Sequence, residues 1–520
     1  MSVSRDNGAG PIRNRHVVAV EGGRDGVGKT LMSVNLSVYL AQLGRNVILF
    51  DADPNGSNAH TMLGLDHPPL AHRRAIRDQT APSVATSVPG LRLVPAAYDP
   101  WRMTPRRTTR ASHWMAQLDD HDADYVVIHL GTSTVPAALD AFVEAGLSIC
   151  VTAPEPPAID ATYRFCRALF ARRLRRTLMR ERHRLRIVDK ALAQLPPLPT
   201  PRALVSEIAR FDQHVANLAA HQLQRLRPRL VVGKTRLRQD LDLGPAMVSL
   251  AERYLGISLD YLGYVEQDDA AWLTARRRRP LLIDAPTSKA SRNIERVARR
   301  ILALLAQPRR HHDDEPLVDA KGLNAPLTLY QVLGVDRSAS DDEIRRAYKL
   351  QRSIFRDDSL PVVSIVDEET MRREQALMTE AYDTLLDPSR RRAYDLSVFP
   401  DDEPHAPQPQ RGPTATEAEL AVLQAELARE ITGDTQFTGP LLKRAREARG
   451  LDIHDVANTT KISPMHLRAL EEEKMSTLPA LVYVRGFLQQ VAKALHLDPA
   501  QVTKSYLKRY RAARPSEADP

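Results

Sequence analysis

The chain has 520 residues, of which 43% are hydrophobic, 26% are charged and 5% are aromatic, and its formal net charge is +9. This length exceeds what one hydrophobic core can serve, so the composition indicates a soluble, globular protein of several domains. The sequence has no apolar leader and no run of about 18 apolar residues, which argues against a secretory signal and a membrane-spanning segment.

The remaining composition points to the cell interior and gives little information about partners. The only cysteines, Cys150 and Cys166, lack metal-ligand spacing, and so few thiols favour a reducing, cytoplasmic location. Much of the positive charge lies in arginine runs such as "ARRLRRTLMRERHRLR". Solvated helix faces explain such runs more simply than a dedicated nucleic-acid or lipid patch. The charge therefore favours anionic partners only weakly.

The order of apolar patterns predicts a multidomain chain, an α/β domain followed by two small all-α domains. In the first part, apolar runs such as "HVVAV", "NVILFD" and "YVVIHL" alternate with longer amphipathic segments, which predicts a parallel sheet flanked by helices. Two later segments have helical periodicity without strand signals. The expected divisions are a disordered N-terminus 1–15, an α/β domain 16–306, a linker 307–326, a helical domain 327–398, a linker 399–437, a helical domain 438–511 and a tail 512–520.

The segment "EGGRDGVGKT" joins the first apolar run to a helical pattern and satisfies the phosphate-loop motif. In such a loop, glycines let backbone N–H groups approach phosphate oxygens, and the helix N-terminus adds positive potential. Lys29 is expected to reach the outer phosphates, and the Thr30 hydroxyl to help hold Mg²⁺. The predicted nucleotide-binding residues are Gly23, Arg24, Gly26, Val27, Gly28, Lys29 and Thr30.

These segments resemble the MinD/ParA group of P-loop ATPases, particularly its FlhG-like members. "GGRDGVGKT" corresponds to their "GGKGGVGKT", and "DADPNGSN" resembles their first switch segment. The resemblance implies ATP or ADP with Mg²⁺ as ligands, and a nucleotide-dependent homodimer in which Arg24 stands for a lysine that reaches the partner's phosphates. It also implies that Asp53 positions the attacking water and that Asp51 lies beside the metal.

Three positions depart from that family pattern. Asp25 replaces a glycine near the terminal phosphate, where a carboxylate repels the ligand unless it is paired, with Arg24 or Mg²⁺ as the expected partner. His129 stands where the family has an aspartate that orders a Mg²⁺-bound water, and imidazole is a poor ligand for this hard ion. Gly233 replaces an asparagine that contacts the base. The departures favour nucleotide binding with slow or absent hydrolysis. A working ATPase and a loop that binds nothing are the alternatives.

The first helical domain resembles a DnaJ-type J-domain, through "PLTLYQVLGVDRSASDDEIRRAYKLQ" and "ALMTEAYDTLLDPSRRRAYD". Ser340 followed by Glu343 predicts a capping box at the start of its second helix. The His-Pro-Asp triplet with which that family stimulates Hsp70 is absent, and "IFRDDSLPVVS" stands in its place. We therefore expect no Hsp70 stimulation and a J-like hairpin used for docking, with an inert spacer as the alternative.

The last domain, 438–511, resembles the Cro-like helix-turn-helix of RodZ-type proteins. Ser463 is expected to cap its third helix. If the domain bound DNA, Met465, His466 and Arg468 would face base edges and Lys461 a phosphate. In RodZ-type proteins this fold binds a cytoskeletal filament protein instead, so protein docking is favoured over DNA.

The sequence thus predicts a cytoplasmic spatial regulator or scaffold. Its MinD/ParA-like domain would bind nucleotide with impaired hydrolysis, and its two helical modules would dock protein partners, such as cytoskeletal, polar or motility components. Two alternatives stay open. One is a transcription regulator that binds DNA through residues 438–511, and the other is an active positioning ATPase.

Overall fold

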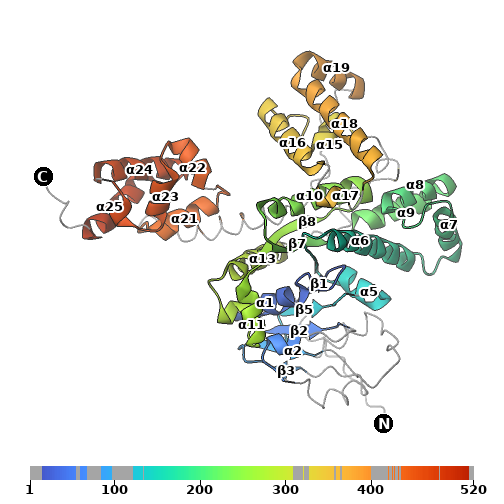
Figure 1. Ribbon diagram of the computed structural model, residues 1–520, viewed down its shortest axis with the longest axis horizontal. Coiled ribbons are helices and arrows are strands. Elements are labelled where there is room, and N and C mark those ends of the chain that lie inside the picture. The colour runs from blue at the N-terminus through green and yellow to red at the C-terminus, as the bar shows by residue number, and fades with distance from the viewer. Residues whose placement is uncertain are drawn as a thin grey trace, which may run out of the picture. The chain divides into compact units, whose positions relative to one another are not determined.

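The computed structural model describes most of the three expected domains in two compact units (Figure 1). Residues 1–14 of the expected disordered N-terminus, most of both linkers and the end of the first switch segment lie outside the described residues. The units are Met1–Ala298 with Pro308–Arg411, and Arg299–Gln307 with Gly412–Pro520. The described residues are 15–53, 59–66, 83–95, 121–132, 134–307, 320, 327–356, 359–363, 366–399, 420, 424, 427, 431, 435–451, 453–479 and 481–513.

The first domain is built on a sheet of eight strands within the described residues, in the order β3-β4-β2-β5-β1-β6-β7-β8. All neighbours pair in parallel except β3 and β4, which confirms the predicted α/β fold class. The apolar runs predicted the central strands, but the sequence did not single out β3, β4 or β8. The strands are β1 His16–Glu21, β2 Val47–Asp51, β3 Val84–Ala85, β4 Leu91–Val94, β5 Tyr125–His129, β6 Leu147–Thr152, β7 Arg229–Thr235 and β8 Asp260–Glu266.

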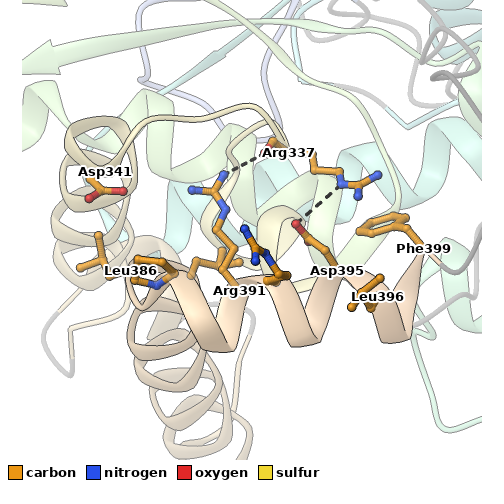
Figure 2. Close-up of a pocket in the computed structure, with 10 residues that line it drawn as sticks. Arg337, Asp341, Leu386, Arg391, Asp395, Leu396 and Phe399 are labelled. Carbon is orange, nitrogen blue, oxygen red and sulfur yellow. Dashed lines mark hydrogen bonds and ion pairs between the residues drawn. The ribbon is translucent and has the colours of Figure 1, made fainter. Parts of the chain in front are cut away.

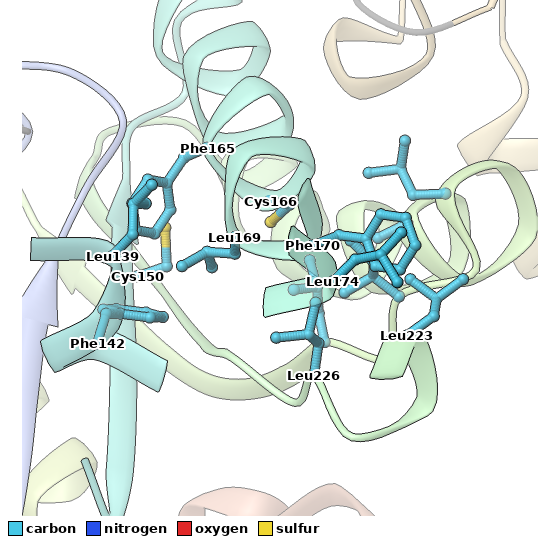
Figure 3. Packing of buried hydrophobic residues seen from close by; sticks show 14 of the residues in the cluster. Leu139, Phe142, Cys150, Phe165, Cys166, Leu169, Phe170, Leu174, Leu223 and Leu226 are labelled. Atoms are coloured by element: carbon cyan, nitrogen blue, oxygen red, sulfur yellow. The ribbon is translucent and has the colours of Figure 1, made fainter. Parts of the chain in front are cut away.

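Helices cover this sheet and bury its central strands, whose residues such as Val18 and Ile149 have no exposed surface. Figure 3 shows one part of this core, where Phe142 and Phe165 meet edge to face with ring centroids 5.1 Å apart. The helices are α1 Lys29–Gln42, α2 Ala59–Met62, α5 Pro136–Glu144, α6 Pro156–Thr177, α7 Arg182–Ala193, α8 Pro201–Phe211, α9 Gln213–Gln224, α10 Leu243–Leu250, α11 Asp269–Arg276, α12 Leu281–Asp284 and α13 Lys289–Ala306. No helix among the described residues is long and apolar enough to cross a membrane.

The arginine run on α6 is largely bound by the domain itself. Arg172 makes a two-pronged ion pair with Asp140, at 2.7 and 2.6 Å. Arg173 donates to Gln222 at 2.8 Å. The next two arginines of the run also form ion pairs, Arg175 with Asp189 and Arg176 with Glu144. Because these guanidinium groups already have partners, the run contributes to helix packing and gives little free positive charge.

The J-like domain starts each of its longer helices with a side-chain cap. The side chain of Ser340 accepts from the Glu343 N–H at 3.4 Å, and Glu343 Oε2 accepts from the Ser340 N–H at 2.7 Å, so the predicted capping box is confirmed. Asp367 caps α18 in a similar way. The helices are α15 Leu329–Leu333, α16 Asp341–Ile354, α17 Leu360–Val363, α18 Glu368–Leu386 and α19 Pro388–Val398.

The J-like domain packs directly against the α/β domain, through the segment that replaces the His-Pro-Asp triplet. In that segment α17 lies against α10 and α6. Val362 and Phe355 are buried in one hydrophobic cluster with Ala246 and Leu250 of α10. The segment that stands in place of the His-Pro-Asp triplet is therefore partly covered by the α/β domain of the same chain.

A buried ion pair secures this contact. Arg253 lies in a π-helical turn, Ala251–Leu255, that continues α10, and it pairs with Glu374 of α18. Only 9% and 12% of the two side chains are exposed. The Arg253 guanidinium also lies 5.3 Å from the centre of the Phe355 ring, a cation–π distance.

The second unit contains the helix-turn-helix domain, with a core of its own. Arg446 forms a fork with Glu471, at 2.6 and 2.9 Å, and joins the first helix to the third. Tyr506 donates to the Leu470 carbonyl at 2.7 Å. The helices are α21 Gly439–Glu447, α22 Ile453–Thr460, α23 Pro464–Glu471, the short 3₁₀ turn Met475–Thr477, α24 Leu481–Ala494 and α25 Pro499–Ala513.

The buried pair predicts a large effect of removing one partner. Glu374→Ala leaves the Arg253 charge buried without its carboxylate, so the free energy of unfolding should fall by about 3 kcal/mol. Glu368→Ala is the matched control, because its pair with Arg372 is exposed and should contribute about 0.5 kcal/mol or less. Urea unfolding of the full chain measures both. Equal effects of the two substitutions would contradict a stabilising role for the Arg253 contact.

Candidate phosphate-binding site

The phosphate loop lies at the carboxyl edge of the sheet, where strands β1, β5 and β2 end side by side. Val20 of β1 and Asp51 of β2 both pair in register with His129 of β5. The loop leaves β1 after Glu21 and becomes helix α1 at Lys29. Ligands of parallel α/β sheets bind at this edge, so the structure brings the predicted residues of three strands to one place.

Two glycines give the loop its shape. Gly28 caps α1 with φ 105° and Gly26 has φ 81°. Residues other than glycine rarely adopt these backbone conformations. Gly23 is fixed by space instead, since a Cβ there would lie 2.2 Å from the Ala161 carbonyl oxygen. The glycines of the motif are therefore required by the fold of the loop, whatever it binds.

Lys29 points into the site from the start of α1 and is buried. Its ammonium donates to the Arg24 carbonyl at 2.7 Å, to Asp25 Oδ1 at 3.3 Å and to the Thr132 hydroxyl. Thr132 follows β5 and donates in turn to the same Asp25 oxygen. Lysine, aspartate and threonine thus form a closed triangle over the loop.

The partner of Asp25 differs from the sequence expectation. We expected Arg24 or Mg²⁺ to balance this carboxylate. In place of Arg24 the structure has Lys29 and Thr132, and Mg²⁺ stays a prediction. Arg24 turns away toward Glu155, 3.4 Å distant, in a half-exposed pair. The reason is the fold of the loop, which brings residue 25 back over the start of α1 at Lys29. The hydrogen bond from Thr132, followed by the charge of Lys29, holds the pKa of Asp25 below its ordinary value.

His129 is buried beneath Thr30, with 1% of its surface exposed. The Thr30 hydroxyl lies 3.2 Å from Nε2, and the Ser33 hydroxyl 3.4 Å from Nδ1. The Ser33 hydroxyl donates its only hydrogen to the Lys29 carbonyl oxygen, at 3.0 Å. It can therefore only accept from Nδ1–H, which assigns the proton to Nδ1 and leaves Nε2 to accept from Thr30.

This tautomer has a consequence for metal binding. With its hydrogen directed to His129, Thr30 keeps its oxygen lone pairs for a cation. The carboxylate of Asp51 is buried at the neighbouring strand end. One hydroxyl and one carboxylate are oxygen ligands that fit Mg²⁺, provided phosphates and water supply the rest. Within the described residues no cluster of three His, Cys, Asp or Glu side chains could hold a metal alone.

Asp53 and Gly131 meet at close range beside the loop. A Cβ at Gly131 would lie 2.3 Å from Asp53 Cγ, so another residue would displace the Asp53 side chain, and the φ of 70° at this position also favours glycine. The Asp53 N–H donates to Asp51 Oδ1 at 3.3 Å. The two predicted switch aspartates thus lie together, and residues 54–58 of that segment are outside the described residues.

Gly233 has a structural explanation that the sequence did not reveal. A Cβ at this position would lie 2.5 Å from the carbonyl oxygen of Val27 in the phosphate loop. Any larger residue, including the asparagine of the resembling family, would push the loop away from the end of β7. The residues that the sequence missed here, Thr132 and Glu155, carry no motif signal and become visible only through their contacts.

The predicted recognition residues of the helix-turn-helix lie at the start of α23. Ser463 caps this helix by accepting from the His466 N–H at 3.4 Å, as predicted. Lys461, Met465 and Arg468 are exposed. His466 is only half-buried, and its ring lies 5.4 Å from that of Phe487.

A cavity of about 430 Å³ lies in the J-like domain between α18, α19 and the loop before α16 (Figure 2). Its charged side chains face one another. Arg391 donates to the Arg337 carbonyl at 2.8 Å, and Arg337 pairs with Asp395 at 3.9 Å while stacking on Phe399. These contacts tie α19 to the rest of the domain, and the arginines are already engaged.

Family models match all three domains. Residues 13–174 match the ParA family of P-loop NTPases, described as NUBPL iron-transfer P-loop NTPase. Residues 328–395 match the DnaJ domain, and residues 441–502 match a helix-turn-helix domain. With the fold and the loop geometry, these matches define the class as an α/β P-loop NTPase. More particularly, the first domain is of the MinD/ParA type, and the chain fuses it to a DnaJ domain and a helix-turn-helix domain.

Similar proteins match part of this chain. The antiactivator FleN of Pseudomonas aeruginosa is 25% identical over 312 residues, which are 58% of this chain and 92% of FleN. An iron-sulfur cluster carrier protein of Synechocystis is 31% identical over 159 residues, only 42% of its own length. The solved structure of MinD from Pyrococcus horikoshii with Mg-ADP is 19% identical, covers 56% of this chain and all of its own, and has a TM-score of 0.35.

The buried histidine predicts a pH dependence of stability. Burial, followed by the Lys29 charge, lowers the pKa of His129 from 6.5 to about 4. Between these pH values the unfolded chain takes up a proton that the native state does not bind, so stability falls as pH drops from about 6.5 to about 4. This residue contributes a slope of at most about 1.4 kcal/mol per pH unit.

His129→Gln keeps a neutral, hydrogen-bonding side chain and should remove that part of the slope. Urea midpoints of both proteins between pH 4.5 and 7.5 measure it. An identical pH profile for the variant would contradict a neutral, buried His129.

Proposed function

We propose that the protein is a nucleotide-responsive regulator or scaffold, with a loop that binds ADP or ATP but hydrolyses ATP slowly or not at all. The observation that carries this proposal is the combination of an intact phosphate loop with altered surroundings. Lys29 is buried and aimed into the site, as phosphate binding requires. Yet a carboxylate, Asp25, lies on that ammonium, and a neutral imidazole replaces the expected aspartate beside Thr30.

Hydrolysis is the step that these changes weaken. Phosphoryl transfer depends on positioning and on neutralising the charge of the transferred group, chiefly by Mg²⁺ and cationic side chains. A His129 side chain bonded to Thr30 and Ser33 cannot add negative charge to order a metal-bound water. Asp25 adds negative charge where the reaction needs positive charge.

The contacts of the helical domains favour a docking role over stimulation of Hsp70. The segment that replaces the Hsp70-stimulating triplet packs into the α/β domain of the same chain, through Val362 and the Arg253 pair. We therefore propose that the J-like domain extends the first domain as a fixed docking surface. On the helix-turn-helix, exposed Met465 and Tyr483 favour a protein partner.

The similarity to FleN is consistent with regulation through protein partners, since FleN is described as an antiactivator. By the MinD/ParA resemblance, the partners would be components of polar, motility or cytoskeletal machinery. A nucleotide-dependent homodimer fits the position of Arg24, whose half-exposed pair with Glu155 costs little to break.

Nucleotide binding without turnover is directly testable. Calorimetry of the full chain should detect ADP binding in the presence of Mg²⁺. Lys29→Ala should weaken it by about 100-fold, because the loop loses the buried positive charge nearest to the bound phosphates. Lys190→Ala, on α7 and outside the loop, is the matched control and should leave binding unchanged. No binding by the wild-type chain would refute the proposal.

Placing an aspartate at position 129, where the resembling family has one, tests whether hydrolysis is weakened. Steady-state phosphate release should be close to background in the wild type, and His129→Asp should raise it by about tenfold if the missing aspartate limits catalysis. Robust Mg²⁺-dependent release from the wild-type chain would instead establish an active positioning ATPase.

A second candidate, DNA binding, is favoured by one observation on α23. Lys461 and Arg468 are exposed together, while the acidic neighbour Glu471 is neutralised by Arg446. If this candidate holds, mobility shifts should show sequence-selective binding that weakens steeply with salt and is lost in Arg468→Ala. Weak binding that is the same for all sequences and unaffected by Arg468→Ala would leave protein docking as the role of this domain.

A further inference from the structure

The ammonium of Lys29 has its full set of hydrogen-bond acceptors within the protein. A lysine ammonium carries three protons. They are directed to the Arg24 carbonyl, Asp25 Oδ1 and the Thr132 hydroxyl. The chain itself therefore supplies an acceptor for each proton of the cation that is expected to meet the outer phosphates.

The Asp25 carboxylate takes the role of an outer phosphate oxygen in this arrangement. It accepts hydrogen bonds from Lys29 and from Thr132, which follows the switch glycine Gly131. The inner part of the loop is different. Beside Gly26 and Gly28 there is open space within 4 Å of where a Cβ would lie. The backbone N–H groups of that inner part are the ones that hold the α- and β-phosphates in phosphate loops.

Negative charge further distinguishes the outer part of the loop from the inner part. The Asp25 side chain is 82% exposed, and the Thr132 hydrogen bond and Lys29 hold its pKa below the ordinary value. It is therefore ionised at neutral pH and faces the mouth of the site. A third phosphate would bring additional negative charge to this point, whereas a diphosphate would end before it.

We propose that Asp25 makes this loop selective for nucleoside diphosphates over triphosphates, an inference that rests on the proposed nucleotide binding. The diphosphate occupies the open inner part of the loop while the Asp25–Lys29–Thr132 triangle stays closed. A triphosphate must displace the carboxylate from both partners and then bear its repulsion. Asp25 is thus a specificity-determining residue, and the protein responds to the diphosphate form.

The test compares two nucleotides on the full chain. ADP and the non-hydrolysable analogue β,γ-imido-ATP are titrated by calorimetry with Mg²⁺ into the wild type, Asp25→Asn and Asp25→Gly. The wild type should bind ADP about tenfold more tightly than the analogue. Both variants should bring that ratio close to one, mainly through tighter binding of the analogue. Asp189→Asn, which removes the same charge from an exposed pair on α7, should keep the wild-type ratio.

The possible outcomes separate this inference from the proposed function. If the wild type binds both nucleotides equally, or if Asp25→Asn keeps the tenfold ratio, the selectivity is overturned while nucleotide binding stands. If no nucleotide binds to the wild type or to Asp25→Gly, both proposals fail. Unfolding midpoints equal to that of the wild type exclude misfolding of the variants as the cause.

Discussion

The structure of the site depends on one buried charge, the ammonium of Lys29. A buried ammonium needs hydrogen-bond acceptors and an opposite charge nearby, because leaving a buried charge unpaired costs several kcal/mol. Here the chain supplies the acceptors itself, through the Arg24 carbonyl, Asp25 and Thr132. The same need explains why an aspartate is tolerated in a phosphate loop. It replaces an oxygen that a ligand would otherwise provide, and it joins the loop to the segment after β5.

A second set of contacts links the first domain to the J-like domain. The chain that leaves the phosphate-loop edge at Gly233 runs through α10 into the π-helical turn that carries Arg253. That turn holds Glu374 of the J-like domain, and α17 packs beside it. The segment that stands in place of the His-Pro-Asp triplet is thus packed inside the molecule.

Sequence patterns predicted the three domains, the central strands and the helix caps at Ser340 and Ser463, because each depends on residues close in the chain. They missed β3, β4 and β8, which are short or lie at the sheet edges, where burial patterns are weak. In the site, they identified the loop, Asp51, Asp53 and the departures from the family. They named Arg24 where the structure has Lys29 beside Asp25, because which side-chain cation lies near a carboxylate depends on how the loop folds back on itself.

The sequence by itself determined that this chain has a phosphate loop, and that an aspartate, a histidine and a glycine stand at three unusual positions in and around it. Only the tertiary structure decided what these residues do. Asp25 binds Lys29 and Thr132, His129 receives the Thr30 hydrogen, and Gly233 makes room for the Val27 carbonyl. Each of these contacts except the Asp25–Lys29 pair joins residues about 100 or more positions apart in the sequence. Such contacts form only when the strands pack side by side in the sheet.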